Sequence, residues 1–134
     1  MAAAIPFVRE MQFAYGEVQQ VSPLIRRVVS NNPGPFTFLG TGVYIIGQGE
    51  VAIIDPGPDM PGQQEMLKAA IGADRLTHIL LTHGHADHSP AAAPLARATG
   101  AKIYANPVPV NHAHVGVVLE AEDDENFRFD VALK

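Results

Sequence analysis

Residues 83–88 read His-Gly-His-Ala-Asp-His and directly follow an apolar run over 76–81. Polar side chains crowded at the end of a buried strand carry a desolvation cost unless a partner satisfies them, and a metal ion is such a partner. In an extended loop, residues two apart point the same way, so the imidazoles of His83 and His85 can converge on one ion. Asp87 and His88 lie at the end of the loop and could address a second ion. A polar loop with incidental histidines is the weaker interpretation.

The sequence before this segment predicts β-structure. Loose alternation over 17–30 around Pro23 favours an edge strand or two short strands. Two apolar runs, 43–46 and 51–54, are joined by a glycine-rich tetrapeptide and predict a β-hairpin. Because these runs are almost wholly apolar, we expect strands that are covered on both faces.

After the hairpin, predicted helices alternate with predicted strands. Helical spacing over 61–71 and an alanine-rich stretch over 90–99 predict two helices, and Gly72 and Gly100 are placed to end them. This alternation is typical of an α/β protein with its chemistry on loops at strand ends. The further predicted strands lie at 76–81, 102–105 and around 127–133.

Composition limits the classes of protein that this chain can belong to. A length of 134 residues suits one domain, taken as 1–134. The net charge of −5 argues against a nucleic-acid partner, which would require clustered basic residues. The absence of cysteine restricts a metal site to nitrogen and oxygen ligands and suits a reducing cytoplasm. No stretch reaches the roughly 18 apolar residues of a membrane helix, and the start lacks a basic signal-peptide region, so we expect a soluble, cytoplasmic protein without a membrane partner.

The histidine segment and its flanks resemble the metallo-β-lactamase superfamily. The pattern H-x-H-x-D-H at 83–88 is the signature of that superfamily. The strand over 77–82 that leads into the pattern, the strand over 101–104 after it, and the hairpin with its Asp-x-Gly turn over 42–57 resemble the family's corresponding elements. The resemblance covers residues 32–105 and is closest to the hydrolase branch that includes glyoxalase-like thioesterases and an endoribonuclease.

The resemblance implies an αβ/βα sandwich with two zinc ions in a cleft at the edge of the sheets. By this resemblance, His83 and His85 match ligands of the first metal, and Asp87 and His88 match ligands of the second. Asp55 matches the turn aspartate that orients the ligands by hydrogen bonding. The implied chemistry is attack by a metal-activated water, which Asp87 would orient while helping to move its proton.

Three ligands of the family have no counterpart that we can identify in this sequence: a later histidine, a bridging aspartate and a histidine near the C-terminus. His112 and His114 are two apart, but their setting does not resemble the family's Gly-His-Thr/Ser stretch, so we interpret them as exposed loop histidines. Asp123 and Asp124 lie in an acidic run that is typical of a solvated loop. Because relatives in this family are longer, we expect the N-terminal αβ half of a larger enzyme.

The function predicted from these residues is that of a zinc-dependent hydrolase acting on a small ester, thioester or lactam. A nuclease of the same fold and a non-catalytic metal-binding fragment are the alternatives. The expected partners are a small-molecule substrate and, through an uncovered apolar sheet face, a second copy of the chain in a homo-oligomer. His78 is interpreted as a strand residue outside the metal site.

Overall fold

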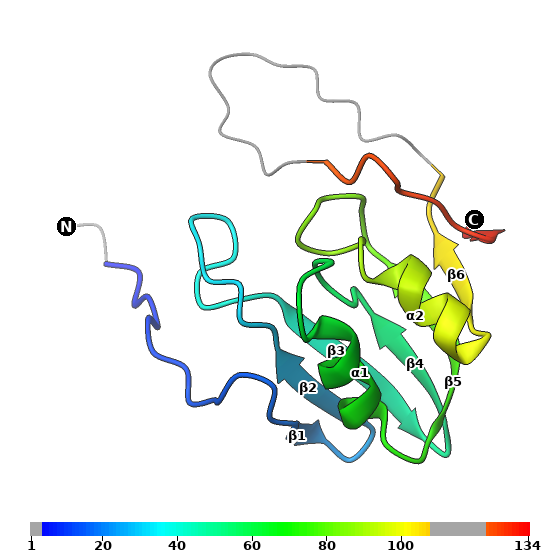
Figure 1. Ribbon diagram of the computed structural model, residues 1–134. Helices are drawn as coiled ribbons and strands as arrows, with labels where there is room; N and C mark the ends of the chain where they lie inside the picture. The colour runs from blue at the N-terminus through cyan, green and yellow to red at the C-terminus, as the bar shows by residue number, and fades with distance from the viewer. Residues whose placement is uncertain (1–3, 108–122) are drawn as a thin grey trace.

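The computed structural model describes residues 4–107 and 123–134, which form one mixed sheet with helices on the side that faces the viewer (Figure 1). None of the helices in these two ranges is both long and apolar enough to cross a membrane. The strands are β1 Gln19–Ser22, β2 Ile25–Val29, β3 Gly42–Gln48, β4 Glu50–Ile54, β5 Arg75–Leu81, β6 Lys102–Ala105 and β7 Val131–Ala132, and the helices are α1 Gln63–Ile71 and α2 Ala92–Thr99.

The strands lie in the sheet in the same order as in the chain, from β1 to β7. Neighbours from β1 to β4 are antiparallel, whereas those from β4 to β7 are parallel. Parallel neighbours need a crossover, and α1 supplies it between β4 and β5, as α2 does between β5 and β6. The loops that follow β4 and β5 therefore leave the sheet at the same edge.

The predicted α/β class, hairpin and two helices are confirmed. The region around Pro23 forms two short strands, β1 and β2, rather than a single edge strand. Helix α2 begins at Ala92, two residues after the predicted start at 90. The last strand is much shorter than the predicted 127–133, because Phe127 and Phe129 pack against the core and only the two residues of β7 pair with β6.

The two faces of the sheet differ in what covers them. On one face Ile45, Ile53 and Ile79 are 0% exposed, and Leu67 of α1 and Leu95 of α2 belong to the same core. Alternation turns the intervening side chains to the other face. The cover that we predicted on both faces is therefore found on only one within the described residues, since α1 and α2 share a side. A row of half-buried side chains crosses the other face in register: Tyr44, Ile54, Leu80 and Tyr104.

Candidate metal centre

The four residues of the signature lie on the loop 82–91 between β5 and α2, as the sequence predicts. The loop turns back on itself because the backbone N–H groups of His88 and Ser89 both donate to the carbonyl of His85, at 3.0 and 3.2 Å. Gly57 binds the loop on both sides: its N–H donates to the carbonyl of His88, and its own carbonyl accepts from Ala91. The loop after β5 is thus fixed to the turn after β4.

Asp55 directly follows the last residue of β4 and is the buried carboxylate of the site, at 6% exposure. It accepts hydrogen bonds from the N–H of Thr82 at 2.9 Å and from the hydroxyl of Thr82 at 2.6 Å, and its Oδ2 lies 3.1 Å from Nδ1 of His88. Burial raises the pKa of Asp55, but the hydrogen bonds from His88 and Thr82 outweigh burial and hold the pKa below its ordinary value. Asp55 is therefore ionised and acts as an acceptor.

The hydroxyl of Thr82 determines which nitrogen of His83 carries a proton. A hydroxyl has one hydrogen, and Thr82 donates it to Asp55. The oxygen of Thr82 lies 2.8 Å from Nδ1 of His83, so it must accept a hydrogen bond from that nitrogen. The Nε2 atom of His83 then keeps its lone pair, which is the form that binds a metal.

His88 and Asp87 form a pair that needs a cation between them. Nδ1 of His88 donates to the ionised Asp55, so Nε2 of a neutral His88 presents a lone pair to Oδ2 of Asp87, 3.2 Å away. Either a proton or a metal ion can satisfy these two acceptors. The hydrogen bond to Asp55 raises the pKa of His88 and outweighs desolvation, which lowers it. Without a metal, a proton on His88 therefore supplies the cation between the two residues. The Oδ1 atom of Asp87 is buried and has no hydrogen-bond partner in the described part of the chain.

The imidazoles of the signature crowd around His83, whose ring centre lies 4.5 Å from that of His85 and 4.2 Å from that of His88. Desolvation lowers the pKa of His83, and the charges of His88 and His85 lower it further, so the neutral ring is favoured. Ligand atoms of Asp55, His83 and His88 lie within 4.8 Å of one another. Because Asp55 already accepts from Thr82 and His88, it suits an orienting role better than ligation. Imidazole and carboxylate donors so arranged fit a zinc ion.

The acidic run after 122 contacts the loop 82–91, hereafter called the metal loop. We expected this run to be a solvated loop, and these contacts were not predicted. The N–H of Asp124 donates to the carbonyl of Gly84 at 2.7 Å, and its carboxylate accepts from the hydroxyl of Ser89 at 2.7 Å. Asp123 forms a β-bridge with His85 and places Oδ1 3.7 Å from its Nε2, although its side chain is 75% exposed. Composition alone gives no signal that separates this segment from a solvated one.

Thr41 is a second contact of the metal loop that sequence reasoning missed. Its hydroxyl donates to the carbonyl of Asp87 at 2.9 Å. Asn32 holds Thr41 in place by accepting from its N–H at 2.9 Å and donating to its hydroxyl at 3.0 Å. Asn32 lies nine positions before Thr41 and Thr41 lies 46 positions before Asp87, so this support of the loop depends on the tertiary structure.

His78 is the only other histidine in the part of the chain that the structure describes, and it does not join this cluster. His78 is exposed on β5 and stacks on Tyr104, with ring centres 4.8 Å apart. Its position outside the site is as predicted. His112 and His114 lie outside the described residues.

The sequence model of the metallo-beta-lactamase superfamily matches residues 37–126 of this chain. An atrochrysone carboxyl ACP thioesterase of Cryptosporiopsis sp. is 43% identical over 76 residues, which are 54% of this chain and 24% of that protein. A lactamase-like protein of Pestalotiopsis fici is 41% identical over the same shares of the two chains. The matched part therefore spans about a quarter of the length of these curated relatives.

Solved structures show the same fold. BJP-1, a subclass B3 metallo-β-lactamase of Bradyrhizobium japonicum, aligns with a TM-score of 0.58 at 26% identity, covering 90% of this chain and 46% of that one. A β-lactamase domain protein from Burkholderia ambifaria aligns with a TM-score of 0.59 at 18% identity, over 73% of this chain and 34% of its own. The second likeness concerns the fold alone.

Proposed function

Because this chain belongs to the metallo-β-lactamase superfamily, we propose that it provides the zinc-binding loop of a hydrolase that cleaves a small ester, thioester or lactam. Among these substrates a thioester is favoured, because relatives that match residues of this chain are named ACP thioesterases. The proposal assigns His83, His85, Asp87 and His88 as metal ligands and Asp55 as the residue that orients them.

The observation that carries this proposal is the pair formed by His88 and Asp87. Two acceptor atoms face each other at 3.2 Å, and the second oxygen of Asp87 is buried without a partner in the ranges that the structure describes. A buried, unsatisfied carboxylate oxygen is destabilising unless a ligand completes it. A divalent cation beside Nε2 of His88 would satisfy both residues at once.

Each residue of the site has a separate task in this proposal. Zinc bound here would supply a water molecule that ionises near neutral pH and a positive charge that stabilises the developing oxyanion. Thr82 and Asp55 keep Nδ1 of His83 and of His88 protonated, so both Nε2 atoms keep a lone pair that can bind a metal. The free Oδ1 of Asp87 would orient the attacking water and accept its proton.

The alternatives differ from this proposal in substrate or in activity. A phosphodiesterase of the same fold would use the same loop, but the net charge of −5 opposes a polyanionic substrate. A metal-binding protein without catalysis would bind zinc and turn over nothing. The cytoplasmic location and the homo-oligomer stay predictions from the sequence.

The experiment measures zinc content and turnover on the same protein. The zinc-loaded protein is offered an acyl thioester, a β-lactam and a phosphodiester, and zinc is counted by elemental analysis. His85→Ala should lower zinc content and thioester turnover together, because a ligand is lost. His78→Ala is the matched control, since it removes an exposed histidine from β5 and should change neither quantity.

Unchanged zinc in His85→Ala would reject the ligand assignment. Turnover of the phosphodiester alone would favour the nuclease, and zinc binding without turnover of any substrate would favour the non-catalytic protein.

A further inference from the structure

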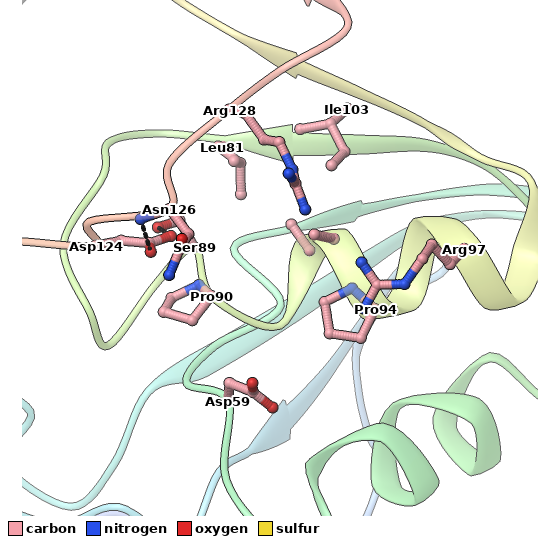
Figure 2. Close-up of a pocket in the computed structure, with 12 residues that line it drawn as sticks. Asp59, Leu81, Ser89, Pro90, Pro94, Arg97, Ile103, Asp124, Asn126 and Arg128 are labelled. Atoms are coloured by element: carbon pink, nitrogen blue, oxygen red, sulfur yellow. Dashed lines mark hydrogen bonds between the residues drawn. The ribbon is translucent and has the colours of Figure 1, made fainter.

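A cavity of about 180 Å³ lies between the start of α2 and the segment 124–128 (Figure 2). Ser89 and Pro90 form one part of its wall, so it borders the end of the metal loop. Arg97 of α2 and Arg128 of the later segment also line it. A space of this size holds several water molecules or a small ligand group.

The two arginines approach the cavity from different parts of the chain, one from α2 and one from the segment above it (Figure 2). In the part of the chain that the structure describes, neither guanidinium has a hydrogen bond or an ion pair. The arginines at the far end of the sheet differ, because Arg26 pairs with Asp74 and Arg75 pairs with Glu50. Two cations facing one cavity repel each other, and an anion between them would relieve this repulsion.

The acidic residues of the cavity do not supply that anion. Asp124 is engaged elsewhere, since its carboxylate accepts from Ser89 at 2.7 Å and from the N–H of Asn126 at 2.9 Å. Asp59 lies apart from both guanidinium groups, on the other side of Pro90 and Pro94 (Figure 2). Ala92 and Ala93 also line the cavity, so the positive end of the α2 dipole adds to the field of the arginines.

We propose that this cavity is a second ligand site, which binds the phosphate group of a small molecule between Arg97 and Arg128. A guanidinium presents a planar fork of N–H donors that matches two oxygens of an oxyanion. A carboxylate has two oxygens and is filled by one such fork. A phosphate group has further oxygens, so it can accept from two forks at once.

The site does not depend on the proposed hydrolase activity. Its donors belong to α2 and to the segment 124–128, and none of them is among the assigned zinc ligands. Phosphate binding can therefore be measured in protein from which zinc has been removed, where the metal site cannot itself bind the anion. Failure of this test leaves the hydrolase proposal standing, and failure of the hydrolase test leaves this one standing.

The experiment is a titration of the chelator-treated chain with inorganic phosphate at constant ionic strength, followed by the amide chemical shifts of residues 89–97 and 124–128. We expect saturable shifts, which the double variant Arg97→Ala/Arg128→Ala weakens at least about 10-fold. The Lys/Lys variant keeps both charges but loses the forks, and it should give an intermediate loss. Arg75→Ala removes the same charge at the opposite end of β5 and should leave binding unchanged.

A titration with acetate distinguishes the two anion classes, and acetate should bind at least about 10-fold more weakly than phosphate. The proposal is overturned if phosphate causes no saturable shift, if Arg75→Ala weakens binding as much as the double variant, or if acetate binds as tightly as phosphate. Both arginines are exposed, so their replacement should leave the melting temperature of the chain unchanged.

Discussion

The two ends of the central strands β4 and β5 both carry polar clusters, but the clusters differ in how complete they are. At the end where these strands begin, Glu50 pairs with Arg75 at 3.4 Å, and both side chains are mostly exposed. Close by, Asp74 accepts from Arg26 at 2.6 Å and from the N–H of Gly49 at 3.0 Å. Every charge in this far-end cluster has an opposite charge beside it.

At the end where β4 and β5 finish, the polar groups lie close together, and some of their atoms lack a hydrogen-bond partner within the described residues. Asp55, Thr82 and His88 form a connected network, yet it ends on the pair of His88 Nε2 and Asp87 Oδ2, which a proton or a metal ion must complete, and on the buried Oδ1 of Asp87. Incomplete buried polar groups are destabilising, and a bound cation would relieve this cost at the proposed metal site. The comparison teaches that completeness, rather than the number of charged residues, separates a structural cluster from a ligand site.

Loss of a zinc ligand at the end of the sheet that carries the metal site, called the site end, should have the largest effect on zinc affinity. Replacing His88 with Ala should weaken zinc binding at least about 100-fold, because the variant loses a donor and also releases Asp55 from its orienting contact. Competition with a chromogenic zinc chelator measures the affinity. Arg75→Ala is the far-end control and should bind zinc as the parent does. Equal affinities of the parent and the His88 variant would remove the distinction between the two ends.

A smaller effect is expected from Asp55→Asn, which retains the ligands but changes the group that orients them. The variant should bind zinc about 10- to 100-fold more weakly, which is the usual effect of losing an orienting carboxylate. The same chelator competition measures it. Asp74→Asn makes the same chemical change at the far end and should leave the zinc affinity as it was. If the two variants lose affinity equally, the loss comes from general destabilisation and not from orientation.

The stability of the metal-free chain should depend on pH through two groups of the metal site, Asp55 and His88. The folded-state pKa of Asp55 lies below its ordinary 3.8, so its contribution to stability is present above that value and is lost as the pH falls through the folded pKa. The folded-state pKa of His88 lies above its ordinary 6.5, so its contribution is present below 6.5 and is lost as the pH rises through the folded pKa. Melting temperatures recorded across pH in chelator should therefore be highest between these limits.

A comparison of Asp55→Asn with Asp74→Asn separates the pH dependence that comes from the metal site from that of the whole chain. Asp55→Asn removes the contribution of Asp55 and weakens that of His88, which then keeps only Asp87 as a charged partner. The melting temperature of this variant should therefore vary less with pH than that of Asp74→Asn. Parallel curves for the two variants would show that the far end determines the pH dependence as much as the site end does.

The smallest effects are expected within the far-end cluster itself. Asp74→Asn should lower the free energy of unfolding by about 1 kcal/mol, because the aspartate is partly buried and also accepts from a backbone N–H. Glu50→Gln should change it by less than about 0.5 kcal/mol, because an exposed ion pair contributes little. Urea unfolding of the metal-free chain measures both values. A larger loss in Glu50→Gln than in Asp74→Asn would mean that burial does not decide the strength of these pairs.

The sequence predicted those parts of the molecule that depend on local pattern. The hairpin of β3 and β4, both helices and the position of the signature between β5 and α2 follow from apolar periodicity and glycine placement. The contacts of Thr41 with Asp87 and of Asp124 with Ser89 could not be predicted, because they join residues 46 and 35 positions apart. The sequence also did not predict that Arg97 and Arg128 line one cavity, for the same reason. A tertiary contact between polar residues leaves no periodic trace in the sequence.

The strand order from β1 to β7 has a consequence for the way the chain acquires its structure during synthesis. Each new strand pairs with the strand made just before it, so the sheet can grow along one edge as the ribosome delivers the chain. Asp55 emerges before the signature, and the hairpin that carries it can form while residues 82–91 are still inside the exit tunnel. The carboxylate that orients the histidines is thus in place to receive them. The segment 123–128, which contacts the loop through Asp124, is made after the loop, so the histidines stay accessible to zinc until that segment emerges.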